Sequence, residues 1–130
     1  MIVIGYSADR FGHAALEHGI AEAKLRQTSV LVINSTSGEA YSDPRFAQSD
    51  EVRDVERHLR ECGVEFELRQ PVGVDAAREL LSATELDGAE LLVIGIRHRN
   101  PVGKLLLGSV SQQLLLECRK PVLAVKPGES

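Results

Sequence analysis

The sequence predicts a single α/β domain: an open, parallel, five-stranded sheet with helices on both faces. Apolar, β-branched runs recur at 2–4, 30–33, 91–94 and 122–125, and they read as buried strands. Segments with apolar residues at three- and four-residue steps separate the strands, as expected for helices. Alternation of this kind implies right-handed crossovers and a parallel sheet, and 130 residues provide one core but not two.

The first half of the chain contains two fully apolar strands, each followed by a helix. The strand at 2–4 ends at Gly5, and a loop over 6–12 leads into a helix that starts at Phe11 or Gly12 and ends at Arg26. The run 30–33 is apolar on both faces, which suits a strand covered by helices on both sides. Ser49 to Cys62 forms the second helix, and Gly63 is placed to end it.

The second half begins with a strand of different character. Residues 64–69 alternate apolar and charged side chains, which predicts a half-exposed strand at a sheet edge. Asp75 is a credible N-cap for a helix over 76–86. The apolar strand 91–94 follows. A helix that opens at Gly108 comes next, with Leu114, Leu115 and Cys118 expected on its inner side, and the strand 122–125 closes the fold.

The longest irregular stretch spans residues 36–48. A loop of this length within a compact domain serves a function or lacks fixed structure. It would act as a lid over a ligand, as a dimer contact, or as an ordinary mobile surface loop.

We expect a cytoplasmic protein from the absence of targeting and membrane-spanning patterns. No basic, signal-like segment precedes the first apolar run, and no apolar run approaches membrane-spanning length. The cysteines, Cys62 and Cys118, lack the spacing of a metal or redox motif and read as reduced thiols. His13, His18 and His58 are scattered over helical patterns without metal-ligand spacing, so we expect no metal site and no catalytic residue.

The distribution of charge points to a small anionic ligand. The chain has a formal net charge of -4, yet no Asp or Glu lies between Glu90 and Glu117. The same interval carries Arg97, Arg99 and Lys104, together with one histidine. A local positive field on an acidic protein favours a small anion over nucleic acid, which calls for a broad basic face. The ordinary alternative is that these side chains are only solvated.

Several phosphate-binding signatures are absent. The loop after the first strand does not contain the dinucleotide fingerprint G-x-G-x-x-G. Gly103-Lys104 provides the centre of a Walker A motif, but His98 and Leu105 occupy its two outer positions. A receiver domain would carry an Asp after the third strand, where the chain reads Arg69-Gln70.

A different pattern fits. The chain reads Gly95-Ile-Arg-His98, then nine residues, then Gly108-Ser109. This resembles the G-x-x-G-x(9)-G-[ST] motif of nucleotide-binding universal stress proteins, with His98 in place of the second glycine. The resemblance covers nearly the whole chain, including the β-α order and the closing Lys120-Pro-Val-Leu-Ala-Val-Lys. It implies a Rossmann-like fold of the adenine nucleotide α-hydrolase type.

The resemblance also implies a site for ATP or a related adenine nucleotide, with or without magnesium. The expected contact residues follow the first, second and fourth strands or open the fourth helix: Gly5, Tyr6, Ser7, Ser35, Gly95, Arg97, His98, Gly108, Ser109, Val110 and Ser111. Ser7 stands where nucleotide-binding members usually have an Asp, and Asp9 lies two residues on. Independently of the family, a helix N-terminus offers unpaired N–H groups and a positive dipole end to phosphate. Ser109 and Gln112 also fit a capping box, with Ser109 as N-cap.

Three functions remain open from the sequence. The first is a nucleotide-binding sensor or signalling module of the stress response. The second is the same fold without nucleotide, acting as a dimeric protein-interaction module, and the third is a weak nucleotide hydrolase. In each case we expect a homodimer through the apolar edge strand Pro121 to Lys126, because an exposed apolar edge invites pairing. The partner that would read such a signal is not specified by the sequence.

Overall fold

The computed structural model describes residues 1–38, 42–97 and 107–128. Strands and helices alternate along the chain, as the sequence predicted. The elements are β1 (Ile2–Gly5), α1 (Arg10–Arg26), β2 (Val30–Ile33), α2 (Ser49–Cys62), β3 (Phe66–Arg69), α3 (Ala76–Thr84), β4 (Leu91–Gly95), α4 (Ser109–Glu117) and β5 (Val122–Val125).

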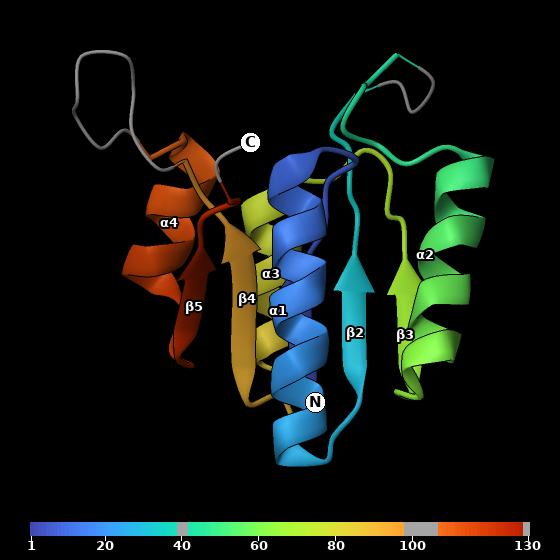
Figure 1. The fold of residues 1–130 in the computed structure, drawn as a ribbon. Helices are drawn as coiled ribbons and strands as arrows, with labels where there is room; N and C mark the ends of the chain where they lie inside the picture. The colour runs from blue at the N-terminus through green and yellow to red at the C-terminus, as the bar shows by residue number, and fades with distance from the viewer. Residues whose placement is uncertain (39–41, 98–106, 129–130) are drawn as a thin grey trace.

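The strands form one parallel sheet in the order β3-β2-β1-β4-β5 (Figure 1). Ile2 aligns with Val30 on one side and with Leu91 on the other, so β1 is the central strand. The two expected edge strands, β3 and β5, are the edges. The half-exposed pattern of β3 reflects this position, because only one of its faces is well covered.

Two apolar cores lie on the two faces of the sheet, because successive strand side chains point to opposite faces. On one face Ile2 and Ile4 pack with α1 and α2, where Leu16 and Leu59 are buried. On the other face alternate strand residues pack with α3 and α4. The strands with continuous apolar runs are therefore buried on both faces, as inferred from the sequence.

Helix ends account for most of the small differences from the sequence predictions. Asp75 caps α3 as predicted, since its side chain accepts a hydrogen bond from the N–H of Ala77. Gly63 ends α2 with a φ of 75°. In α4 the prediction of an inward Leu115 is wrong: that side chain is 40% exposed, while Leu114 is 1% exposed. Helix α3 also ends two residues before the predicted end.

None of the helices within the described ranges combines the length and apolar character that a membrane crossing needs. The cysteines in the described structure, Cys62 and Cys118, are both free, as predicted.

Candidate functional site

The candidate site lies at the carboxyl ends of β1 and β4, which are adjacent in the sheet (Figure 1). From β1 the chain proceeds to β2 and β3 on one side, and β4 and β5 fill the other side. The strand order thus reverses between β1 and β4, and open α/β sheets bind ligands outside such a reversal. Most expected contact residues follow β1, β2 or β4 or open α4, so the fold brings their backbones to one edge. His98 lies outside the described residues.

Helix α4 begins without a side-chain cap. The N-cap is Gly108, with φ -65° and ψ 160°, and not Ser109 as the capping-box interpretation expected. Ser109 is instead the first helical residue, and the N–H of Gln112 donates to the carbonyl of Gly108 at 3.0 Å. With a glycine at the N-cap, no hydroxyl is available to bond the first-turn N–H groups.

The first turn of α4 is open to an anion. Ser109 and Val110 are exposed and Ser111 is half-buried. No acidic residue lies in this turn, and within the described structure the N–H groups of these three residues form no hydrogen bond. The positive end of the helix dipole is therefore uncompensated by protein groups that the structure describes.

The two glycines of the motif have different surroundings. A Cβ added to Gly95 would lie 2.2 Å from the carbonyl oxygen of Phe11, so the backbone at the start of α1 packs directly on this residue. A Cβ at Gly108 would meet no described atom within 4 Å. The packing of α1 thus accounts for Gly95 without a ligand, whereas no described contact accounts for Gly108.

The loop after β1 is fixed by hydrogen bonds of its own. The Tyr6 ring is 5% exposed, and its hydroxyl donates to Glu51 of α2 and lies 3.0 Å from His13 Nε2. Burial, followed by the hydrogen bond to Glu51, raises the pKa of the Tyr6 hydroxyl. The side chain of Tyr6 therefore belongs to the core between α1 and α2, and only its backbone remains at the loop.

Ser7 and Asp9 form a pair at the start of α1. The Ser7 hydroxyl donates to Asp9 Oδ1 at 2.7 Å, and the same oxygen accepts from the N–H of Gly12 at 3.0 Å. Asp9 is the N-cap of α1. One of its carboxylate oxygens is thus occupied by the helix and by Ser7, which limits how far Asp9 substitutes for an Asp at position 7.

Ser35 is half-buried just after β2. The sequence reasoning assigned no role to Asn34, the residue before it. Asn34 is 2% exposed. Its side chain bonds to segments that lie far apart in the sequence: Tyr6, Arg45, Ala47 and Gln70. A polar residue at the end of an apolar strand was the only available signal, because the partners come from other loops.

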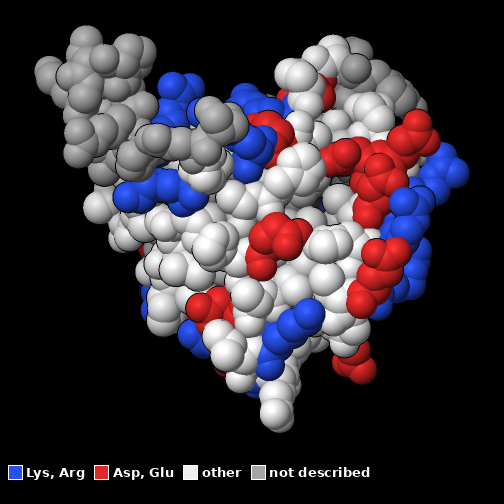
Figure 2. Space-filling view, viewed as in Figure 1, with Lys and Arg blue, Asp and Glu red and all other residues white. Residues whose placement is uncertain are grey.

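Basic side chains lie near the same end of the molecule. Arg97 follows β4 and is exposed, and Lys126 follows β5. Figure 2 shows mainly Lys and Arg among the charged side chains at the upper left of this view, whereas Asp and Glu side chains alternate with Lys and Arg along the right. The asymmetry agrees with the acid-free interval in the sequence.

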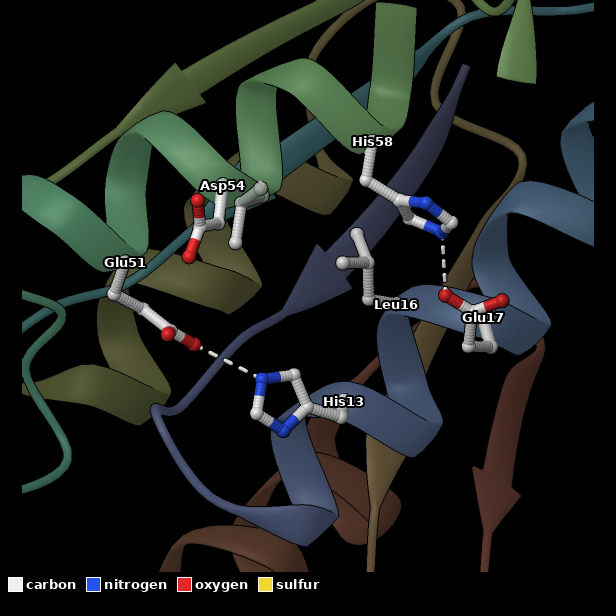
Figure 3. A pocket seen from close by; sticks show the side chains of 7 residues that line it. His13, Leu16, Glu17, Glu51, Asp54 and His58 are labelled. Carbon is white, nitrogen blue, oxygen red and sulfur yellow. Dashed lines mark hydrogen bonds and ion pairs between the residues drawn. The ribbon is translucent and has the colours of Figure 1, made fainter. Parts of the chain in front are cut away.

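A groove of about 260 Å³ lies elsewhere, between α1 and α2 (Figure 3). His13 Nε2 lies 2.9 Å from Glu51 Oε1, and His58 Nε2 lies 2.6 Å from Glu17 Oε1. The Tyr6 hydroxyl, more than His13, holds the pKa of Glu51 below its usual value. Among the described residues, no group of three His, Cys, Asp or Glu side chains is arranged to hold a metal ion. The two pairs join α1 to α2, and none of the expected contact residues lines the groove.

Comparison with known proteins gives one consistent result. The model of the universal stress protein family matches residues 1–126. A universal stress protein of Mycolicibacterium smegmatis is 73% identical over 127 residues, which are 98% of each chain. A universal stress protein from Archaeoglobus fulgidus has 29% identity and a TM-score of 0.77, covering 96% of this chain and 97% of its own. A structure of the universal stress protein from that organism in complex with dAMP has 24% identity and a TM-score of 0.62, covering 96% of both chains.

Proposed function

Because this chain belongs to the universal stress protein family, we propose that it binds ATP or a related adenine nucleotide as a sensor or signalling module. The observation that carries the proposal is the start of α4, where the first turn has no side-chain cap and no acidic residue and where no described atom lies near a Cβ built on Gly108. A helix N-terminus leaves N–H groups without partners in the helix, so such donors at a strand-order reversal favour an anionic ligand.

The phosphates would occupy the N-terminus of α4. Three consecutive N–H groups, those of Ser109, Val110 and Ser111, point out of the helix start and form no described hydrogen bond. The hydroxyls of Ser109 and Ser111 add two donors, and the helix dipole favours negative charge there. The absence of a Cβ at Gly108 permits a phosphate oxygen to approach the backbone.

The base and ribose would lie toward β1 and β2. Gly5, Ser7 and Ser35 stand at the carboxyl ends of these strands. The Tyr6 hydroxyl is bonded to Glu51, so Tyr6 would contribute only through its backbone. The family relative solved with dAMP supports an adenine base on an open sheet of this kind.

A protein-held magnesium ion does not fit the residues around the proposed phosphate site. Magnesium in phosphate sites is usually held by one or two carboxylates in addition to the phosphates. No Asp or Glu lies between Glu90 and Glu117, so β4, the segment after it and the first turns of α4 provide no such ligand. Any magnesium would be held by the nucleotide itself.

Binding is tested by calorimetric titration of the purified protein with ATP, ADP, AMP and cyclic AMP. We expect saturable binding by the wild type and none by Gly108→Val, because the valine side chain would fill the approach to the α4 N-terminus. Gly128→Val is the matched control, since Gly128 is also free of described neighbours and lies past β5. Absence of heat with all four nucleotides would rule the function out.

The same family membership supports a cytoplasmic homodimer paired through Pro121 to Lys126. In β5 the carbonyls of Pro121 and Val125 accept from the β4 side at 3.0 and 2.8 Å, so by alternation the backbone of Ala124 faces the open edge. Exposed apolar side chains lie nearby in sequence, with Leu116 of α4 85% exposed. Ala124→Pro should give a monomer by light scattering after gel filtration, and a wild-type monomer would contradict the pairing.

A further inference from the structure

The carboxamide of Asn34 joins three loops at the carboxyl ends of β1, β2 and β3. Its Nδ2 donates to the carbonyls of Tyr6 and Arg45, both at 3.0 Å. Its Oδ1 accepts from the N–H of Ala47 at 2.7 Å and from Gln70 Nε2 at 3.1 Å. All four hydrogen-bonding positions of the amide are therefore used.

The orientation of this amide is fixed by its partners. The N–H of Ala47 can only donate and the carbonyls of Tyr6 and Arg45 can only accept, so a flipped Asn34 would oppose like groups on both sides. Gln70 reinforces the arrangement, because its Nε2 also donates to the carbonyl of Ala47 at 2.9 Å. Such a network is fully satisfied and rigid in one geometry only.

This network adjoins, along the chain, the residues expected on the base side of the proposed nucleotide site. Asn34 immediately precedes Ser35, and its partner Tyr6 immediately precedes Ser7, so the two residues expected at the base flank the network in sequence. The network also ties residues 45–47 to the loop after β1, where the N–H of Ala8 donates to the carbonyl of Arg45 at 2.9 Å. A change in the amide would move both backbones together.

We propose that Asn34 is a positioning residue for the adenine side of the site, which sets the backbone of Tyr6, Ser7 and Ser35 for ligand contact. The inference rests on the proposed function. Asn34 does not touch the ligand; it acts through the loops that do. Gln70 has the same role but contributes less to positioning, since it bonds to the network only through Nε2.

The test is ATP affinity by calorimetry, measured well below every unfolding midpoint. Asn34→Asp keeps the size and the acceptor oxygens but places a carboxylate oxygen against the carbonyls of Tyr6 and Arg45. We expect it to weaken ATP binding by about tenfold or more, the effect of losing one or two buried hydrogen bonds. Gln70→Leu should weaken binding by a few-fold, and it carries the test if Asn34→Asp does not fold.

Thr84→Val is the control. Thr84 is also buried, at 1% exposed, and its hydroxyl donates to the carbonyl of Leu81 at 2.7 Å, but it lies at the end of α3, away from the strand carboxyl ends. We expect it to lower the unfolding midpoint without changing ATP affinity. Loss of stability in the Asn34 and Gln70 variants with unchanged affinity would overturn the positioning role alone. A wild type that binds no ATP would overturn the proposed function, and this inference with it.

Discussion

The two sides of the candidate site are built in opposite ways. On the β1–β2–β3 side, a buried amide with every donor and acceptor used ties the loops together. On the β4–α4 side, the helix starts at a glycine with no side-chain cap and no described partner for its first-turn N–H groups. On the first side the polar groups stabilise the fold, and on the second side the N–H groups remain available to a ligand.

Within the motif, the same contrast separates the two glycines. Gly95 is required by the fold, because α1 packs against it, and Gly108 is not constrained by described neighbours. A pattern of spaced glycines therefore combines a packing requirement and a binding requirement, which the sequence alone does not distinguish.

The largest effect on stability is expected from a substitution at Gly95. Gly95→Val should lower the free energy of unfolding by about 3 kcal/mol or more, since its Cβ would overlap the backbone of Phe11 and cannot be relieved by a rotamer change. Gly108→Val should lower it by no more than about 1 kcal/mol, because valine is a poorer N-cap residue than glycine but meets no described atom there. Urea unfolding of both variants is the measurement, and equal losses would show that Gly108 is also structural.

A smaller effect is expected at Glu51, which holds Tyr6 and hence the base-side loop. Its folded pKa is lowered, mainly by the Tyr6 hydroxyl, so its contribution is present above the usual value of 4.5 and is lost as pH falls through the folded pKa. Glu51→Gln should cost about 1 kcal/mol of unfolding free energy at pH 7. The difference from wild type should shrink below pH 4.5.

Glu61→Gln is the matched control for this prediction, because Glu61 lies exposed on the same helix. Urea unfolding at a series of pH values measures both variants. A Glu51→Gln difference that stays constant down to strongly acidic pH would show that the carboxylate does not support the loop.

The smallest effect is expected on ATP affinity, from a substitution at Arg97 on the phosphate side of the site. Arg97→Ala should weaken ATP binding by about two- to fivefold, the range of one exposed charge pair, and raising the salt concentration should reduce the difference. Arg119→Ala is the control, since Arg119 is also exposed but follows the opposite end of α4. Equal losses in both variants would indicate general attraction by net charge instead of a local contact.

Much of the fold could be predicted from the sequence because local patterns and burial agree there. Apolar runs such as 30–33 become strands buried on both faces, and the alternation in 64–69 correctly predicts an edge. The bounds of α2 and the cap at Asp75 were also predicted, since capping depends on adjacent residues. The capping box at Ser109 was wrong: the same short pattern fits two registers, and the helix begins at Ser109, one residue earlier than a cap at that position requires.

The side-chain network could not be predicted, because its members are distant in sequence. Asn34 bonds to residues 28 and 36 positions away, and Glu51 reaches Tyr6 across 45 positions. No local spacing signals such pairs. The prediction that Tyr6 contacts the base was based on its position in the loop after β1. Only the structure shows that its ring lies in the core between α1 and α2.

Phosphate binding at the start of α4 is tested most directly by nitrogen-15 NMR of the labelled protein titrated with ATP. We expect the largest shifts in the amide resonances of Ser109, Val110 and Ser111, because hydrogen bonds to phosphate oxygens would form at those N–H groups. Shifts that saturate elsewhere while these three amides stay unchanged, or no shifts at millimolar ATP, would contradict it.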